Sequence, residues 1–332
     1  MAQATTTSDT YLVSSGGGMR EDLEDTIWEL FPADTWALTN LDKVKAESTT
    51  HEWLGDELAA AAGNAQIEGD ETDASDIVPP ARYGNYQQIA KKIFNISGTL
   101  EVVSKAGRRS EIARESTKQM RELKRDMEYA LTREQIGTAG GAGTARTTAG
   151  MEAWIGGTAS SAAATNVVLS TTTASSTTVA VTSGVPGTAI VDGTNTAAFA
   201  EADLQLALEA AWADGGDPTT ILVSPTQKKA IDAFTGVATR FVDVGKASEA
   251  SIIGAANLYV SDFGRHTVQL HRYMRTSVAL CLDPSMWACS FLRRPFSERL
   301  AKNGDAHRYH IVSEFGLVSR NWKSSSKVVA LS

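Results

Sequence analysis

The sequence predicts an α+β protein, and three observations support this fold class. Residues Lys105 to Gln135 have the apolar periodicity of one long amphipathic helix. Residues 84–103 and 308–322 are rich in β-branched and aromatic residues, which is typical of strands. Between them, from residue 197 to 283, short helical and strand patterns alternate. With 332 residues, the chain is long enough for about two domains.

The composition excludes several classes of protein. The hydrophobic fraction is 42% and the charged fraction 21%, which excludes wholesale disorder and a collagen-like chain. Two cysteines cannot hold a disulfide scaffold together. No run of about 18 apolar residues predicts a membrane span, and residues 1–18 show no secretory signal. We therefore expect synthesis in the cytoplasm.

The first 80 residues are expected to form an arm and an exposed excursion. Residues 1–18 are rich in Thr, Ser and Gly, and an amphipathic stretch from Arg20 to Phe31 ends at Pro32. Residues 33–50 are expected to be extended. The following segment, 51–82, is acidic and poor in aliphatic residues, so it cannot bury a core of its own. We expect something outside the chain to stabilise it.

The predicted long helix has two contrasting faces. Its apolar face comprises Ile112, Met120, Leu123, Met127 and Leu131. Its other face mixes acids and bases, and pairs such as Glu115 with Lys118 fall at the spacing of helical ion pairs. This interleaving argues against a dedicated DNA site, which would show an unbalanced basic stripe. We expect a solvated or inter-subunit face.

The middle of the chain changes character twice. A Gly/Ala/Thr linker at 137–150 is followed by residues 153–191, which contain no charged side chain. We interpret that stretch as a surface loop or small β insertion, with a Ser/Thr-rich stalk as the alternative. From residue 197 we expect the following elements: a helix ended by Gly215-Gly216, a strand at 221–223, a helix at 225–234, and strands at 257–260, 267–270, 277–282 and 286–292.

Charge is distributed unevenly along the chain. Residues 1–80 have a net charge of −14, whereas 81–135 and 286–332 each have +5, within an overall charge of −8. This polarity suggests that one segment lies across another, within or between chains. From charge alone, however, an acidic N-terminal region that is simply solvated is the favoured interpretation.

Motifs that carry catalysis or cofactor binding are missing. The sequence has no phosphate-binding P-loop, no nucleophile elbow and no glycine-rich dinucleotide turn after a strand. His307 and His310 are three apart on a predicted strand and would point to opposite faces, which disfavours zinc. Cys281 and Cys289 flank a turn and are expected to be buried and inert. We predict no catalytic residues, no cofactor and no metal.

Short motifs along nearly the whole chain resemble one family of tailed-phage head proteins. The resemblance is carried by the following runs: Arg20-Glu21-Asp22-Leu23, His51-Glu52-Trp53, residues 65–70 (AQIEGD), Gly84-Asn85-Tyr86-Gln87-Gln88-Ile89, Asn95-Ile96-Ser97-Gly98-Thr99, Glu122-Leu123-Lys124-Arg125-Asp126, Gly215-Gly216-Asp217-Pro218, Val260-Ser261-Asp262-Phe263-Gly264 and Leu292-Arg293-Arg294-Pro295-Phe296. The sequence is similar to the SU-ten-like major head proteins, which have the Hong Kong 97-type capsid fold. Residues 158–190 match least.

The resemblance implies a division of the chain into six parts. They are an N-terminal arm (1–50), an extended E-loop (51–103), a peripheral domain with a spine helix (104–150), a Ser/Thr/Ala-rich β insertion or loop (151–199), an α/β axial domain (200–283) and closing strands of the peripheral domain (284–332). The implied function is structural: a major capsid protein assembling with itself as pentamers and hexamers into an icosahedral head.

The resemblance also implies partners and a place. Expected partners are a portal, scaffold or decoration proteins, and enclosed double-stranded DNA that is not bound sequence-specifically; no membrane is expected. The protein would assemble in the bacterial cytoplasm and reside in the virion capsid. A surface decoration protein or adhesin, and a soluble α/β enzyme, are the alternatives.

Contacts between subunits are expected to join the acidic excursion to bases of a neighbour. Hydrophobic anchors would supply most of the binding energy, while charge would set register and rate. The candidate residues for inter-subunit contact are Trp53, Leu54, Glu68, Asp70, Glu71, Tyr86, Arg108 and Arg125.

Overall fold

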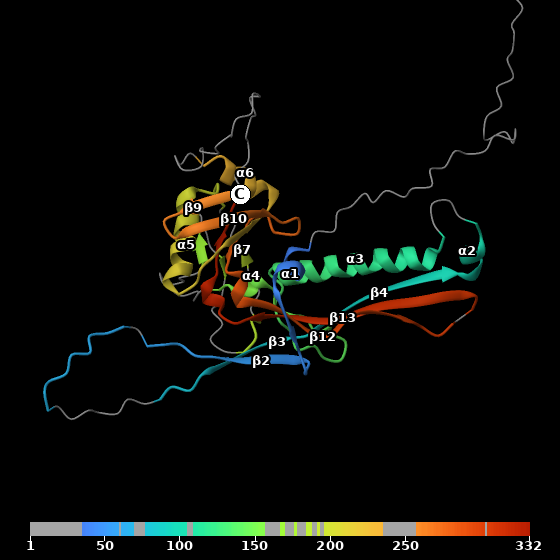
Figure 1. Ribbon diagram of the computed structural model, residues 1–332, viewed down its shortest axis with the longest axis horizontal. Coiled ribbons are helices and arrows are strands. Elements are labelled where there is room, and N and C mark those ends of the chain that lie inside the picture. The colour runs from blue at the N-terminus through green and yellow to red at the C-terminus, as the bar shows by residue number, and fades with distance from the viewer. Residues whose placement is uncertain are drawn as a thin grey trace, which may run out of the picture.

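The protein consists of an elongated lobe, a compact lobe and a loop that projects from them (Figure 1). The computed structural model describes residues 35–59, 61–69, 77–104, 109–156, 167–169, 176–177, 184–187, 191–192, 196–234, 257–302 and 304–332. The predicted amphipathic stretch at 20–31 lies outside the described residues.

The elongated lobe is a four-stranded sheet with a long helix lying along it (Figure 1). The strand order is β1 (Asp42–Lys45), β12 (Trp287–Arg299), β13 (Ala306–Ser319), β4 (Gln88–Ser97). β1 is parallel to β12, and the other pairs are antiparallel. The helix is α3 (Glu111–Thr132), and three short helices, α1 (Trp36–Asn40), α2 (Gly98–Val102) and α4 (Met151–Trp154), lie at its ends and side.

The compact lobe is built on a six-stranded sheet. Its strand order is β5 (Val167–Leu169), β14 (Ser326–Val329), β11 (Ala279–Leu282), β8 (Thr220–Val223), β10 (Gly264–Leu270), β9 (Leu258–Ser261). The helices α5 (Glu201–Ala213) and α6 (Pro225–Asp232) pack on it. Two 3-10 turns, Pro284–Met286 and Trp322–Ser324, lead the chain between the lobes.

Two small antiparallel pairs complete the described elements. The strands β2 (Thr50–Gly55) and β3 (Ala81–Tyr86) pair from Thr50 opposite Tyr86 to Gly55 opposite Ala81. The chain between them, residues 56–80, is the projecting loop, of which 56–59, 61–69 and 77–80 are described. The second pair is β6 (Ser176–Thr177) with β7 (Val191–Asp192).

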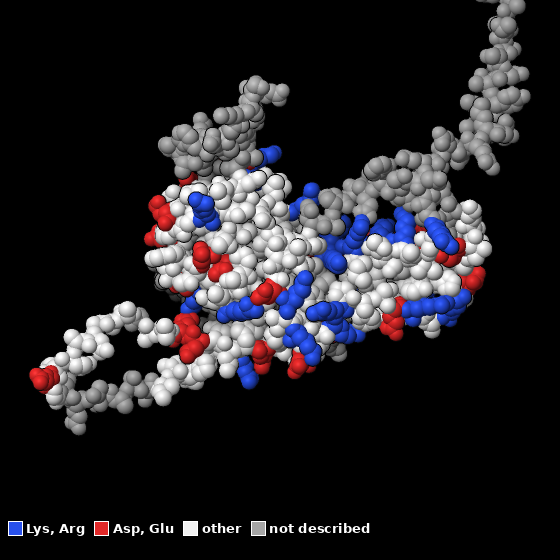
Figure 2. Space-filling view, in the orientation of Figure 1, with Lys and Arg blue, Asp and Glu red and all other residues white. Residues whose placement is uncertain are grey.

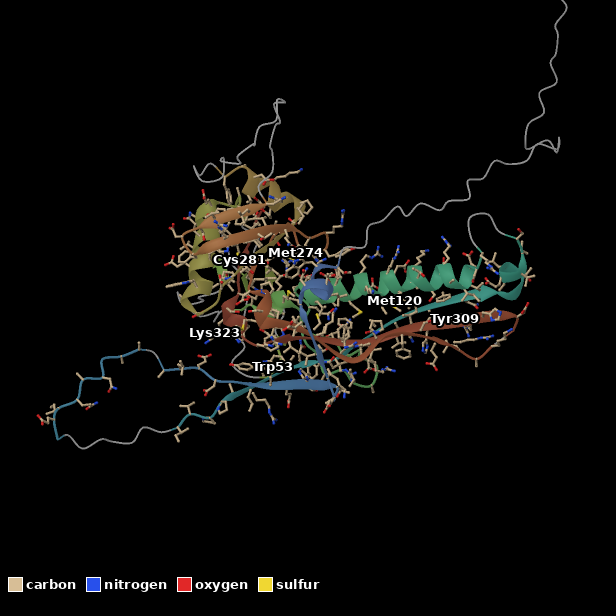
Figure 3. All side chains as sticks on the ribbon, viewed as in Figure 1. Trp53, Met120, Met274, Cys281, Tyr309 and Lys323 are labelled. Carbon is tan, nitrogen blue, oxygen red and sulfur yellow. The ribbon has the colours of Figure 1, made fainter. Side chains whose placement is uncertain are left out.

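The long helix is stabilised by an N-terminal cap and by an apolar stripe that packs on the sheet. The Ser110 hydroxyl accepts from the backbone N–H of Ala113, at 3.3 Å, and caps the N-terminus. The stripe of Leu123, Met127 and Leu131 is fully buried. It packs against the sheet, where the ring of Phe94 stacks on that of Tyr309 with centroids 5.4 Å apart. Met120 and Tyr309 lie in the layer between helix and sheet (Figure 3).

Several predicted elements differ in extent. The helix begins at Glu111 rather than near Lys105, so its 22 residues span about 33 Å. Residues 98–102 were expected in a strand but form α2, because the Ser97 hydroxyl caps a helical turn by accepting from Leu100 N–H. A short helix, α1, likewise occupies part of the stretch expected to be extended. Side-chain capping therefore outweighs strand propensity at 98–102, whereas α1 has no side-chain cap.

Two predictions about placement were wrong. Residues 151–155 were assigned to a surface insertion, yet Met151, Trp154 and Ile155 are fully buried in the core of the elongated lobe. Residues 284–332 were expected to complete one sheet, but β14 enters the compact lobe between β5 and β11. Its four residues are all buried there, because a central strand is covered on both faces.

Candidate assembly surfaces

The projecting loop exposes apolar side chains that the chain itself leaves uncovered. Leu58 is 99% exposed and Ile77 95%, and Ile67 and Val78 are exposed nearly as much. Glu68 is also exposed. A soluble monomer gains nothing by presenting a loop of this kind to water. The loop therefore has the composition of a segment that another molecule covers.

The foot of the loop is fixed to the body of the molecule. Trp53 on β2 packs against Trp154, with ring centroids 5.4 Å apart, and Lys323 Nζ lies 2.5 Å from Glu57 Oε1 (Figure 3). Trp53 is thus partly buried within its own chain, and Tyr86 on β3 is also half-buried. Leu54, by contrast, is 67% exposed.

The sheet of the elongated lobe has a second face, opposite α3. Lys92 on β4 pairs with Asp126 of α3 at 2.6 Å, so alternate residues such as Ile89 and Ile93 point away from the helix. Each of these isoleucines is 51% exposed. We call this the outer sheet face; its exposed members include Ile89, Lys91, Ile93, Arg293, Phe296, Glu298 and Arg308. It combines apolar side chains with more bases than acids, and Arg293 pairs with Glu314 at 2.6 Å.

Acids and bases along the N-terminal half of α3 pair with each other: Arg114 Nη1 lies 2.9 Å from Glu111 and 3.1 Å from Glu115. Glu111 and Glu128 are buried, and the side chain of Glu115 is only 19% exposed. At 100° per residue, Arg114, Lys118, Arg121 and Arg125 fall within a sector of roughly 60° on the side away from the sheet. Figure 2 shows Lys and Arg gathered along this helix. The predicted ion pair between Glu115 and Lys118 is present, with the two groups 3.8 Å apart.

One buried carboxylate joins three segments of the chain. Glu128 Oε1 accepts from Ala37 N–H at 2.7 Å, and Oε2 accepts from Leu38 N–H at 3.1 Å. The same carboxylate lies 2.9 Å from His271 Nε2, while Tyr273 N–H donates to His271 Nδ1. Since Nδ1 accepts, Nε2 carries the proton and donates to Glu128. This carboxylate fixes α1 and the loop after β10 to α3.

A second buried charge cluster connects the two lobes. Lys327 of β14 is fully buried and donates to the carbonyl oxygen of Glu152 at 2.8 Å. Glu152 Oε1 in turn lies 3.1 Å from Arg275 Nη1, which also contacts Glu134. Burial lowers the pKa of Lys327 to about 7 and raises that of Glu152.

Sequence reasoning missed both buried clusters. A signal existed for the second, because Glu152 interrupts an apolar run, and a charge in such a run needs a buried partner. For Glu128 no signal existed, since nothing in the sequence distinguishes it from the other charged residues of the helix.

The described His, Cys, Asp and Glu side chains are not grouped as metal ligands. Within the ranges given above, no three His, Cys, Asp or Glu side chains are grouped to hold a metal ion. His307 accepts from Arg299 at Nδ1, and His310 pairs with Glu298. Among the helices described, none is long and apolar enough to cross a membrane.

The two thiols are buried, as predicted, but they are not neighbours on paired strands. Cys281 lies on β11 in the compact lobe, and Cys289 lies on β12 in the elongated lobe. Burial raises the pKa of each thiol to about 12. Neither has the thiolate character of a nucleophile.

Comparison with known proteins identifies the family. The family model for the SU10 major capsid protein matches residues 2–332. The chain belongs to this family. It is 26% identical over 328 residues to the major capsid protein of Escherichia phage Phieco32, with 92% of each chain covered. It is therefore the major capsid protein of a tailed phage and a component of the virion capsid.

Solved structures show the same fold at low sequence identity. The cyanophage A-1(L) capsid subunit is 15% identical, with a TM-score of 0.67 over 96% of this chain and 98% of that one. A Mycobacterium phage Bobi chain is 12% identical, with a TM-score of 0.60 over 95% and 97%. The capsid of an empty GTA particle gives a TM-score of 0.61 at 11% identity over 97% and 98%. The Hong Kong 97-type fold predicted from the sequence is confirmed.

The predicted contact residues have different positions in this fold. Trp53 and Tyr86 lie at the foot of the projecting loop, Leu54 is exposed beside them, and Glu68 lies within the loop. Arg125 is on the solvent side of α3, far along the chain from these residues. Asp70, Glu71 and Arg108 lie outside the described residues.

Proposed function

We propose that this capsid protein assembles as pentamers and hexamers that close into an icosahedral head around double-stranded DNA. The observation that supports this most directly is the projecting loop, whose exposed apolar side chains have no cover in the subunit. A ring of identical subunits supplies that cover by symmetry, since each loop lies on the next subunit.

The surface that fits the loop best is the outer sheet face of a neighbour. Leu58, Ile67 and Ile77 would pack against Ile89, Ile93 and Phe296. The acids Glu68, Asp70 and Glu71 would lie beside Lys91, Arg293 and Arg308 and would set the register. Trp53, Leu54 and Tyr86 would brace the foot of the loop. Arg108 and Arg125 of the spine are less suitable targets, because the outer sheet face offers apolar and basic groups together.

The rest of the assembly follows from the family. We assign residues 1–50 to an arm, 51–103 to the E-loop, 104–155 to the peripheral domain, 156–199 to an insertion and 200–283 to the axial domain. Residues 284–332 close the peripheral sheet, except for β14. A portal and scaffold or decoration proteins are the proposed partners, and DNA is enclosed without sequence-specific binding. Assembly in the host cytoplasm is part of the same proposal.

The alternatives are less well supported. A structural family disfavours a soluble α/β enzyme, and no described cluster of titratable groups suits catalysis. A decoration protein or adhesin would not need the long helix, the projecting loop and the whole-chain match to a major capsid protein.

The test is assembly of the double variant Leu58→Asp/Ile77→Asp, measured by sedimentation and electron microscopy. We expect folded subunits that remain small, because two carboxylates would enter an apolar contact. The variant Ile93→Asp on the outer sheet face should have the same effect. The control is Leu206→Asp, an exposed leucine on α5.

Two results would contradict parts of the proposal. A wild-type yield of shells from the double variant would rule out the loop contact. If reversing the charges of Glu68, Asp70 and Glu71 leaves the yield unchanged, the electrostatic part is wrong while the apolar part stands.

A further inference from the structure

A short segment from the middle of the chain lies on the foot of the projecting loop. We call it the strap; it comprises residues 184–187. Gly184 forms a parallel bridge with Tyr83 of β3. Its N–H donates to Arg82 O at 2.8 Å, and its carbonyl oxygen accepts from Gly84 N–H at 3.1 Å. The strand β3 therefore pairs with β2 along one edge and with the strap along the other.

The strap is also fixed to the body of the elongated lobe. Pro186 is buried, and its carbonyl oxygen accepts from Gly137 N–H at 2.8 Å. The side chain of Val185 packs against the core of this lobe. A Cβ on Gly137 would collide with Cγ1 of Val185, so only glycine fits at this position while the strap is in place. The strap thus joins the foot of the loop to the segment that follows α3.

Without the strap, the foot of the loop would be a ribbon of two strands. Such a ribbon is marginally stable and twists readily, whereas a third strand stiffens it. The inner end is held by the buried Asn85, whose side-chain amide donates to two backbone carbonyl oxygens of the body. Near the outer end, Lys323 contacts Glu57 in a partly exposed ion pair, which contributes little. The strap bonds to Arg82 and Gly84, between these two points.

We propose that the strap sets the direction of the projecting loop in the free subunit and so holds it ready for a neighbour. This inference rests on the assembly proposed above and deepens it. The strands β2 and β3 lead directly into the loop, so the direction of the loop follows that of its foot (Figure 1). A loop whose direction is fixed before docking loses less conformational freedom on binding, and shells then form at a lower subunit concentration.

The direction of the loop is measurable in unassembled, full-length subunits that carry two spin labels. One label is placed in the loop at Ile67→Cys and the other on α3 at Lys124→Cys, both exposed positions. The native Cys281 and Cys289 are buried and stay unlabelled. Electron double resonance then gives the distribution of distances between the labels. We expect this distribution to become about twice as wide in Gly137→Ala, because a foot of three strands becomes one of two.

Three further variants separate the strap from general damage to the fold. The control Gly141→Ala adds a methyl group in open space nearby and should leave the distribution unchanged. The double variant Gly137→Ala/Val185→Ala removes the colliding Cγ1 and should restore the narrow distribution. If Gly137→Ala does not fold, Gly184→Pro replaces it: proline lacks the N–H that bonds to Arg82 and cannot adopt the φ of +79° found here. An unchanged distribution in a folded Gly137→Ala or Gly184→Pro would overturn the proposal.

Salt distinguishes the strap from the ion pair of Lys323 with Glu57 as the feature that directs the loop. The strap binds through backbone hydrogen bonds and an apolar side chain, and residues 153–191 contain no charged side chain. In about 1 M NaCl, which screens exposed charges, we therefore expect the distance distribution to keep its width. If salt alone widens it as much as Gly137→Ala does, the ion pair directs the loop and the proposal is wrong.

Sedimentation of the same variants without labels tests the consequence for assembly. The subunit concentration at which shells appear should rise about fivefold in Gly137→Ala, a cost comparable to that of ordering one side chain at an interface. It should return to the wild-type value in Gly137→Ala/Val185→Ala. Shells at an unchanged concentration, from subunits with a widened distribution, would overturn the role of the strap in assembly. Absence of shells from the wild-type protein would instead contradict the proposed function, while the label distances would still test the strap.

Discussion

Replacing the buried Glu128 by alanine should destabilise the subunit far more than any exposed charge on the same helix. The carboxylate is fully buried and accepts from Ala37 N–H, Leu38 N–H and His271 Nε2–H. Without it, three buried donors lose their acceptor, and each unsatisfied donor costs about 1–3 kcal/mol. Since relaxation and water recover part of that cost, we expect a loss of about 3–5 kcal/mol.

The loss should be both global and local. Urea unfolding followed by tryptophan fluorescence gives the global change, to be compared with the about 5–15 kcal/mol typical of native proteins. Hydrogen exchange gives the local change. In Glu128→Ala, the exchange rates of the Ala37 and Leu38 amides should rise above their wild-type values by more than that of the Leu123 amide, because α1 is no longer bonded to α3. Glu128→Gln keeps one acceptor oxygen and should cost less than Glu128→Ala.

The matched control is Glu122→Ala, a half-buried acid on the same helix. We expect its effect to be within about 0.5 kcal/mol of zero, as for most surface substitutions. If Glu128→Ala and Glu122→Ala differ by less than about 1 kcal/mol, then the buried carboxylate does not hold α1, and the reasoning from its three hydrogen bonds fails.

Three further predictions concern other parts of the core. Burial lowers the pKa of Lys327 from 10.5 to about 7, so between pH 7 and about 10 the unfolded state binds more protons at this residue than the folded state. The free energy of unfolding should therefore increase as pH rises through this range. Urea unfolding measured across the range should show a smaller increase for Lys327→Met. Cys281 and Cys289 should resist a thiol reagent in the native state and react fully in denaturant, since burial raises both pKa values to about 12; rapid native labelling would show that the core opens. Gly150→Ala should lower stability by about 2 kcal/mol or more, because a Cβ there would collide with carbonyl oxygens of Ala130 and Arg133; Gly141→Ala, with open space around it, is the control for the melting temperature.

The family resemblance and the periodicity of α3 were sufficient for the fold class and the function. Short motifs spread over the whole chain predicted a tailed-phage capsid protein, and the family match confirms it. The apolar stripe of Leu123, Met127 and Leu131 predicted a helix packed on one side, since a spacing of three and four residues specifies one face of a helix. The acidic, core-poor segment after β2 predicted the projecting loop.

Other features depend on contacts between residues far apart in the sequence. Lys327 and Glu152 are 175 residues apart, and nothing local predicts that β14 crosses into the second sheet. Trp53 was expected to face a neighbouring subunit, yet it packs partly on Trp154 of its own chain. Whether a large apolar residue finds cover within its chain depends on the packing of both lobes.

The distribution of charge shows most clearly which features follow from the sequence and which depend on the fold. The sequence by itself determined how much charge each segment carries, because composition depends on nothing else: an acidic start and a spine with acids and bases interleaved. Only the tertiary structure decided where that charge lies. Packing against α1 and the loop after β10 buries Glu128, whereas Glu115 stays within 3.8 Å of Lys118 on the same helix. Which charges of the helix are buried depends on the segments that pack on it, and their order along the chain does not reveal this.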